Sequence, residues 1–336
     1  MKQEETLVCE HKAGDERGLS EGRTRMSRSS QSIGIFWAGV SVLCWGTLFP
    51  AASYLLKRGH VDCYSMSHFR FLVAGLAMLV VLAGMERRFP WDRLRKTDWI
   101  QIILFSVFAG GMSVSLFLGQ SLGIPVVNAS MLEAEAPLMI FVLGLVILRN
   151  KSSIVQFAGL VFGFAGSLLV LKAIHAHGFA IKSISAGDAV VFVGAAFWAL
   201  YTVLSNRTIK RIGGLRYSAW SLLFAGLWIL LFQLMTGHPV RVPHEWQDSL
   251  CLLYLGLIPS ALAFFSWNNA QRYISTGLLA MSGYFTPILT ALLGWMLFGE
   301  TVTFMQCLGM VLVFGSALIE PEIAAMIRFP RRDHPS

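Results

Sequence analysis

Long apolar runs separated by short polar connections make up most of the chain. Ten of these runs are long enough for a helix to cross the roughly 30 Å hydrocarbon core of a bilayer. They lie at residues 34–56, 65–84, 99–119, 126–148, 154–173, 187–206, 217–236, 250–270, 276–298 and 303–319. The pattern therefore predicts an all-α integral membrane protein with ten transmembrane helices.

The composition agrees with this prediction. Of the 336 residues, 55% are hydrophobic and only 14% are charged, and the mean hydropathy is +0.61. These values exclude an ordinary soluble domain. The five cysteines form no CxxC pair and no zinc-ligand spacing, so we expect neither a metal site nor a cofactor.

The basic residues lie in the connections between the runs. The net charge is +8, which is also typical of nucleic-acid-binding chains. With the N-terminus inside, however, 21 of the 27 Lys and Arg residues fall on inner segments, five fall on outer loops, and Arg70 lies within the second helix. The positive-inside rule then places both tails, residues 1–33 and 320–336, in the cytoplasm. We expect a multi-pass protein of a bacterial-type inner membrane, with no nucleic-acid partner.

The chain matches itself at an offset of about 150 residues. Pro137 falls on Pro287, and the pattern Gln-x-x-Gly-x-Val at 156–161 falls on the same pattern at 306–311. A slightly different offset places LVAGL, which begins at Leu72, on LFAGL, which begins at Leu223. Several matches in the same order indicate duplicated halves.

The two halves are residues 34–173 and 187–319, with five predicted helices each. Because five is an odd number, the second half must cross the membrane in the opposite sense to the first. Inverted repeats of this kind are typical of secondary transporters, which alternate access around a site near the middle of the membrane.

Two carboxylates fall inside the fourth predicted span. Glu133 and Glu135 precede Pro137, which has no N–H for the Glu133 carbonyl one turn back. Acids at this depth are costly and indicate a functional site. Residues two apart on a helix point about 200° away from each other. We therefore expect one acid to line a polar pathway and the other to pair with a neighbouring helix.

Arg70 is the candidate partner of Glu133. It lies about six residues, or ~9 Å, below the outer end of helix 2, and Glu133 lies about eight residues, or ~12 Å, below the outer end of helix 4. The depths allow a charge pair, which would leave Glu135 to take up a proton as the coupling ion. In the alternative, Arg70 extends to the outer interface and meets no partner.

Four prolines interrupt predicted spans. Pro50, Pro137, Pro259 and Pro287 each free a carbonyl one turn back, at Gly46, Glu133, Leu255 and Gly283. These carbonyls could contact substrate, or meet water and neighbouring Ser or Thr hydroxyls. We treat the prolines as candidate helix breaks and gating positions.

Several short stretches resemble the EamA family of the drug/metabolite transporter superfamily. They are Trp45-Gly46, Phe69-Arg70-Phe71, Ala136-Pro137, Trp198 to Tyr201, and PILTALLGWMLFGE from Pro287 to Glu300. The resemblance, over residues 34–319, implies a ten-helix carrier with two inverted repeats around a central cavity, which moves small organic solutes, commonly outward. Arg149-Asn150 stands where the family usually has Gly-Glu, and Glu133 is an additional acid.

Aromatic residues within the spans are candidates to line an apolar, ring-stacking cavity. The resemblance favours Trp45, Trp198, Tyr201 and Tyr284 as inward-facing, and it implies that Glu300 stabilises the extracellular gate. Asn128 and Ser130 are further polar candidates in the pathway.

We therefore expect a secondary active transporter that exports small metabolites, amino acids or amphipathic and aromatic compounds. An uptake permease or an uncoupled facilitator of the same fold is the alternative. A membrane-embedded enzyme is the rival from another class, but the sequence contains no HExxH and no GxSxG motif. The chain is expected to act as a monomer or a homodimer.

Overall fold

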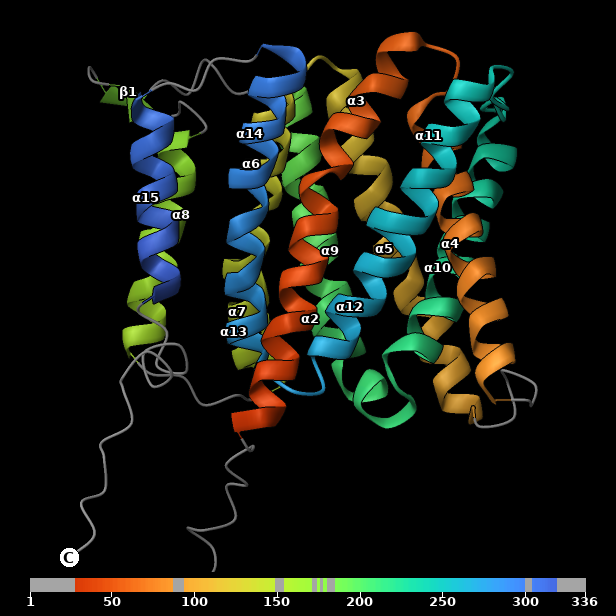
Figure 1. The fold of residues 1–336 in the computed structure, drawn as a ribbon, viewed down its shortest axis with the longest axis horizontal. Helices are drawn as coiled ribbons and strands as arrows, with labels where there is room; N and C mark the ends of the chain where they lie inside the picture. The colour runs from red at the N-terminus through yellow and green to blue at the C-terminus, as the bar shows by residue number, and fades with distance from the viewer. Residues whose placement is uncertain are drawn as a thin grey trace, which may run out of the picture.

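The computed structural model describes residues 28–86, 94–148, 154–170, 174–175, 178–179, 185–299 and 304–318, and the structural statements below concern these residues. They form a bundle of helices that run roughly along one common direction (Figure 1). The one sheet within this part is a short antiparallel hairpin of β1 (Ile174–His175) and β2 (Gly178–Phe179). The fold is all-α in its architecture, as the hydrophobic pattern predicts.

Most helices keep the lengths that the apolar runs predict, and several are divided at internal breaks. The first half contains α2 (Arg28–Gly46), α3 (Leu48–Arg58), α4 (Cys63–Glu86), α5 (Lys96–Ser121), α6 (Val126–Glu133), α7 (Ala136–Ile147) and α8 (Ile154–Val170). The second half contains α9 (Ala186–Ile212), α10 (Gly214–Thr236), α11 (Trp246–Gly256), η2 (Leu257–Leu262), α12 (Ala263–Ala270), α13 (Thr276–Ser282), η3 (Gly283–Phe285), α14 (Thr286–Phe298) and α15 (Phe304–Leu318).

Eight helical segments of the described chain are long and apolar enough to cross a bilayer. They are Gln31–Arg58, Cys63–Glu86, Lys96–Ser121, Asn128–Ile147, Ala186–Ile212, Gly214–Thr236, Trp246–Ala270 and Thr276–Leu297. The protein is thus a multi-pass membrane protein. The expected fifth and tenth spans correspond to α8 and α15, which have 17 and 15 residues. These two helices pack against each other at one side of the bundle (Figure 1), and their crossing stays a prediction.

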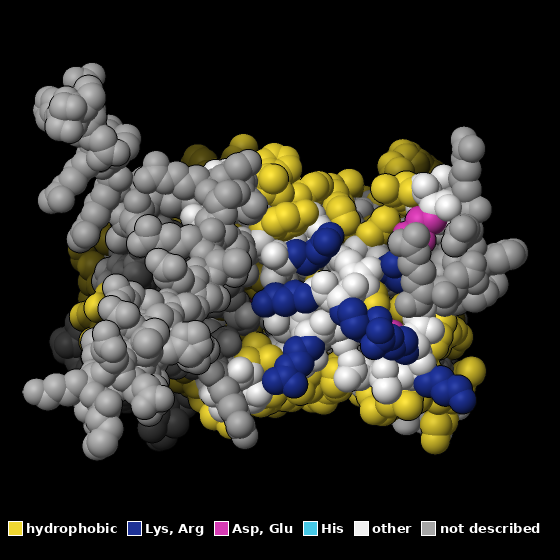
Figure 2. All heavy atoms as spheres, turned by 90° about the horizontal axis from the view of Figure 1, so that it is seen from below, with side chains coloured by type: hydrophobic (Ala, Val, Ile, Leu, Met, Phe, Trp, Pro, Cys, Tyr) yellow, Lys and Arg dark blue, Asp and Glu magenta, His cyan; other side chains and the backbone are white. Residues whose placement is uncertain are grey.

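Basic side chains gather at one end of the bundle. Figure 2 shows Lys and Arg spread over the described part of the face at the bottom of Figure 1. The exposed ones there come from the start of α5, the end of α9 and the segment after α12: Arg95, Lys96, Arg207, Lys210, Arg211 and Arg272. We call this the basic end, and the other the opposite end.

Close contact between α4 and α10 joins the two halves. A Cβ added at Gly75 of α4 would lie 2.6 Å from the backbone nitrogen of Leu223, and one added at Gly226 of α10 would lie 3.0 Å from Leu72. The contact is reciprocal, because each helix offers a glycine to the leucine of the other. The order of the four residues shows that α4 and α10 run antiparallel. Small residues at such crossings let helix backbones approach closely in lipid.

A second matched pair of contacts lies at the two ends of the bundle. A Cβ added at Gly34 of α2 would lie 2.5 Å from Ile274, and one added at Gly187 of α9 would lie 2.9 Å from Ile124. Gly34 and Gly187 are 153 residues apart, and Ile124 and Ile274 are 150 apart. Equivalent positions of the two halves therefore make equivalent contacts.

We predict that Gly75→Ala destabilises the protein while Gly84→Ala does not. The Cβ at Gly75 would collide with the backbone of α10, and such overpacking costs about 1–3 kcal/mol. Gly84 lies on the same helix with nothing within 4 Å of its added Cβ, so alanine there raises stability by up to about 1 kcal/mol. Thermal unfolding of both variants in one detergent tests this, and an equal response of the two would contradict the proposed contact.

Candidate functional site

Helix breaks occur at matching places in the two halves. The helix of the first half stops at Glu133, the end of α6, and resumes at Ala136, where α7 begins with Pro137 in its first turn. In the second half, α13 stops at Ser282, η3 follows, and α14 resumes with Pro287 in its first turn. Proline cannot donate to the preceding turn, which explains why both helices are interrupted just before it.

A small cavity of about 40 Å³ lies between these two breaks. Its walls come from both halves of the chain, from α2, α6, α7, α9, α12, α13, η3 and α14: Trp45, Ser130, Glu133, Ala134, Ala136, Pro137, Ile140, Trp198, Trp267, Ala280, Gly283 and Thr286. Five of the predicted pathway and helix-break residues therefore meet here, namely Trp45, Ser130, Glu133, Pro137 and Trp198.

Three tryptophans form one face of the cavity. The ring of Trp45 lies 5.2 Å from that of Trp198 and 5.1 Å from that of Trp267, and Trp198 lies 5.5 Å from Trp267. Phe264 of α12 contacts two of the three edge-on, with its ring 5.9 Å from Trp45 and 5.3 Å from Trp198. Edge-to-face and tilted arrangements at these distances are favourable.

Sequence reasoning did not single out Trp267 or Phe264. A usable signal was present, because Phe264, Trp267, Asn268 and Gln271 follow a helical spacing of three and four residues. Two amides on the same stripe as two large rings indicate a face turned toward the protein rather than toward lipid. All four residues are buried.

The two acids have different surroundings. Glu133 lines the cavity, and its Oε2 atom is buried with no hydrogen-bond partner in the described chain. Glu135 is 2% exposed, lies outside the set of cavity-lining residues, and interacts electrostatically with Tyr284. The structure thus brings Glu133 to the cavity, whereas the sequence analysis left Glu135 as the acid to take up a proton.

Arg70 is fully buried among aromatic rings. Its guanidinium carbon lies 4.6 Å from the ring centre of Phe71 and 5.0 Å from that of Phe117. None of its three side-chain nitrogens has a hydrogen-bond partner among the described residues. It interacts electrostatically with Glu133, but the ion pairs within 4.0 Å that the described residues form do not include this one. The expected charge pair is therefore a longer-range one.

Tyr201 takes part in a buried polar network. Its hydroxyl lies 3.1 Å from Ser221 Oγ and accepts from Asn268 Nδ2 at 3.1 Å. The Asn268 amide also donates to Ser218 Oγ at 2.8 Å, and Gln271 donates to Asn268 at 3.2 Å. The network links α9, α10 and α12. Tyr201 contacts the tryptophan group through Trp198, 5.4 Å away, but does not line the cavity itself.

Neighbouring hydroxyls satisfy two of the four freed carbonyls. Thr290 of α14 donates to the Gly46 carbonyl at 3.2 Å, and Ser260 donates to the Leu255 carbonyl at 2.7 Å. The chain around Pro259 widens into the π-helical turn η2, as expected where a proline interrupts a helix. Trp45 also donates from Nε1 to the Pro259 carbonyl at 3.0 Å, so the kink at Pro259 orients a ring of the cavity.

The remaining candidates lie around the cavity or outside the described residues. Asn128 is half-buried in the first turn of α6. Tyr284 is buried within η3, with its hydroxyl next to Gly163 of α8. Pro50 is buried in α3, two residues after that helix begins. Glu300 lies outside the described residues.

A larger groove of about 620 Å³ opens at the basic end, between α4, the start of α10, and η2 with α12. Its walls are mostly apolar, and it includes the ion pair between Arg216 and Glu86. The groove contains none of the predicted site residues. We therefore take the small central cavity as the candidate site.

The helices and spans define a multi-pass membrane protein, and a small cavity with polar and aromatic walls lies between the helix breaks of its two halves. A sequence profile of the EamA-like transporter family matches the chain twice, at residues 32–172 and 185–319. The chain therefore belongs to the EamA-like transporter family and is a membrane transporter. This membership favours transport over the membrane-embedded enzyme that the sequence analysis weighed.

Similar proteins cover nearly the whole chain. "Uncharacterized transporter YyaM" of Bacillus subtilis (strain 168) is 26% identical over 304 residues, which span 89% of this chain and 96% of that protein. "Uncharacterized inner membrane transporter YicL" of Salmonella typhimurium is 26% identical over 286 residues, or 83% and 92% of the two chains. A solved crystal structure, 23% identical, matches with a TM-score of 0.68 over 90% of this chain and 100% of its own, which supports the fold.

We predict that Arg70 and Glu133 are energetically coupled. Removing either charge leaves the other buried with less compensation, so Arg70→Met and Glu133→Gln each lower stability. The double variant should lose less stability than the two single variants lose together, and the difference should be about 0.5–3 kcal/mol. A double-mutant cycle of unfolding free energies measures this coupling. The exposed Arg207 is the control, because Arg207→Met combined with Glu133→Gln should be additive; additivity in both cycles would contradict the pairing.

Proposed function

We propose that the protein is a secondary active exporter of small amphipathic or aromatic organic compounds, operating by alternating access around the central cavity. The carrying observation is the cavity itself, which lies where the broken helices of both halves meet. Interrupted helices with polar groups at mid-membrane are typical of secondary-transporter substrate sites. A site shared by two halves can be opened to either side when one half moves against the other.

The contacts between the halves support an inverted repeat of ten helices. In the reciprocal packing of α4 and α10, each helix contacts its own equivalent, as residues do around a two-fold axis. The two helices are antiparallel, which requires that axis to lie across the bundle rather than along it. Helices α8 and α15, the equivalent fifth and tenth elements, also pack against each other.

The charge distribution supports an orientation with the basic end in the cytoplasm. The chain enters α2 at the basic end (Figure 1), so both termini are proposed to be cytoplasmic, in a membrane of the bacterial inner type. The exposed Lys and Arg residues of Figure 2 would then follow the positive-inside rule.

Glu133 is the proposed coupling acid. It is the carboxylate on the cavity wall, and its Oε2 atom is buried without a partner in the part of the chain described. A carboxylate in this position can bind a proton or a positively charged group of a substrate, and the two would then compete. Competition of this kind couples the export of one to the entry of the other.

The cavity wall favours substrates with an apolar or aromatic body. Three indole rings surround the space, and the Trp267 Nε1–H is buried with no hydrogen-bond acceptor among the described residues. Indole faces attract flat rings and organic cations. The unpaired N–H and the unpaired Glu133 oxygen offer one donor and one acceptor to orient a polar group.

The same fold could serve an uptake permease or an uncoupled facilitator, since direction depends on coupling rather than on shape. The chain could act as a monomer, because its two halves together enclose the cavity, or as a homodimer. The flux experiment below separates the coupled carrier from the facilitator.

We predict that proteoliposomes containing the purified protein accumulate aromatic amines or related compounds when a pH gradient is imposed. Glu133→Gln should abolish the accumulation and leave exchange of substrate across the membrane, because the glutamine cannot take up a proton. Radiolabelled flux with a panel of amino acids, nucleosides and aromatic amines measures both processes, with and without the gradient.

Glu135→Gln is the matched control, since Glu135 has the same chemistry and lies two residues away but outside the cavity wall. It should retain gradient-driven accumulation. Accumulation that survives in Glu133→Gln would contradict the assignment of the coupling acid. Exchange that ignores the gradient in the wild-type protein would support the uncoupled facilitator instead.

A further inference from the structure

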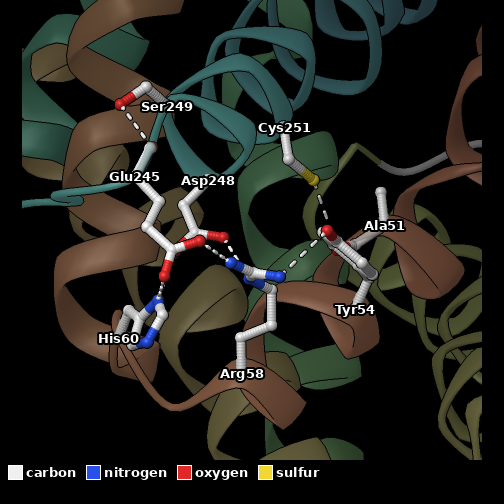
Figure 3. Close-up of polar contacts among 8 residues, drawn as sticks. All are labelled: Ala51, Tyr54, Arg58, His60, Glu245, Asp248, Ser249 and Cys251. Atoms are coloured by element: carbon white, nitrogen blue, oxygen red, sulfur yellow. Dashed lines mark hydrogen bonds and ion pairs between the residues drawn. The ribbon is translucent and has the colours of Figure 1, made fainter.

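An ion pair at the opposite end joins the first half to the second. Arg58, in the last turn of α3, has its Nε 2.5 Å from Oδ1 of Asp248 in the first turn of α11, and it also pairs with Glu245 (Figure 3). His60 Nδ1 lies 2.6 Å from the other oxygen of Asp248. The Asp248 side chain is 0% exposed, whereas that of Arg58 is 28% exposed.

An ion pair of the same construction lies at the basic end. Arg211, in the last turn of α9, pairs with Asp98 in the first turn of α5. The Asp98 side chain is 3% exposed and that of Arg211 is 35% exposed. The carboxylate also accepts from the backbone N–H of Arg95 at 2.7 Å. Both pairs thus join a buried aspartate at a helix start to a half-exposed arginine at a helix end.

The repeat relates the two pairs to each other. Arg58 and Arg211 are 153 residues apart, and Asp98 and Asp248 are 150 apart. These are the same two offsets that relate Gly34 to Gly187 and Ile124 to Ile274 at the matched contacts described above. The equivalent of the pair at one end of the bundle is therefore the pair at the other end.

The opposite-end cluster also resembles a metal site, but its charges are already balanced. Ligand atoms of His60, Glu245 and Asp248 all lie within 4.8 Å of one another. Arg58, however, pairs with both carboxylates, and its fixed positive charge occupies the position that favours a cation. A structural ion pair accounts for this cluster better than a metal ion does.

Three of the four paired residues belong to spans that also carry residues of the cavity wall, and the fourth, Asp98, lies on α5, which packs against the α9 helix of Trp198. Arg58 and Asp248 belong to the spans that carry Trp45 and Trp267, and Arg211 belongs to the helix that carries Trp198. The seam between α3 and α11 is held further by Tyr254, whose hydroxyl donates to Thr47 Oγ1 at 2.5 Å. Separating α3 from α11 would release the spans of Trp45 and Trp267 from each other at the opposite end, and separating α9 from α5 would release the helix of Trp198 at the basic end.

We propose that Arg58–Asp248 and Arg211–Asp98 are the latches of two equivalent gates, which close the central cavity toward the two faces of the membrane. Both latches are formed in this structure, which therefore corresponds to a state with both gates closed. The inference rests on the proposed alternating-access function. During transport one latch breaks while the other holds.

The burial of the two aspartates makes each latch a two-state element. A carboxylate excluded from water is stable beside its arginine, and it is stable again once the gate opens and water reaches it, but the intermediate positions are unfavourable. Removing the aspartate charge should therefore favour the open state of that gate and leave the other gate closed.

A cysteine in the cavity tests the proposal without any substrate. Ser130 lines the cavity and is 1% exposed, so Ser130→Cys, in a background with the five native cysteines replaced, reports when the cavity opens. Labelling with a membrane-impermeant thiol reagent is followed from each face, in right-side-out and in inverted vesicles. Asp248→Asn should raise the labelling rate about fivefold or more from the opposite end, and Asp98→Asn should do so from the basic end.

Arg58→Lys and Arg211→Lys are the conservative controls, and they should label close to the parent because they keep the charge. Size-exclusion profiles identify any variant that fails to fold, in which case Arg58→Gln replaces Asp248→Asn and Arg211→Gln replaces Asp98→Asn, with the increase expected from the same faces. Equal increases from both faces, or no increase from either, would overturn the proposal. Because labelling needs no substrate, a failed flux assay would count against the carrier function and leave this result standing.

Discussion

The crossing of α4 and α10 determines how the two halves of the transporter meet. In lipid there is no hydrophobic driving force between helices, so association depends on close packing. Gly75 and Gly226 provide it, because each accepts a leucine of the other helix against its backbone. The proposed two-fold axis passes through this crossing. The matched helix breaks and ion pairs then lie at equivalent positions on either side of it.

The second constraint is that buried polar groups need partners in the absence of water. Most of the chain meets it. The carbonyls freed by Pro50 and Pro259 accept from Thr290 and Ser260, and Tyr201 lies in a closed network of hydroxyls and amides. The polar groups at these two kinks and the hydroxyl of Tyr201 therefore find their hydrogen-bond partners within the helix bundle and need no ligand.

Some of the buried groups without hydrogen-bond partners in the described chain lie at the cavity. Glu133 Oε2 and Trp267 Nε1 are unpaired on its wall, and the Arg70 guanidinium is unpaired behind it, within the described chain. Unpaired buried groups are costly, and a protein retains them where a ligand supplies the missing contacts. The unpaired donor and acceptor on the cavity wall, together with the matched helix breaks beside them, identify the candidate site.

Much of the architecture follows from the sequence. Apolar runs predict the eight spans because hydrophobic length is the property that the bilayer selects. The equivalence of Pro137 and Pro287 predicts the paired breaks, because proline interrupts a helix wherever it lies within one. The resemblance to the EamA family agrees with the profile match over both halves.

The orientation of individual side chains could not be predicted from the sequence. The sequence argument about Glu133 and Glu135 assumed one continuous helix, but the helix stops at Glu133 and resumes at Ala136, so the rotation between the two acids changes. Trp267 was not singled out, since a tryptophan in a span can face lipid or protein. The latch residues Arg58 and Asp248 were not singled out from the sequence, because their pairing joins positions 190 residues apart in the chain.

Spin-label distances across the two proposed gates would test the central claim most directly. One pair of labels at Lys57 and Leu250 spans the seam at the opposite end, and the equivalent pair at Lys210 and Ile100 spans the seam at the basic end; all four residues are exposed. Alternating access around a two-fold axis predicts that conditions which lengthen one distance shorten or preserve the other, with similar open distances at both ends. Distances that lengthen and shorten together would contradict it.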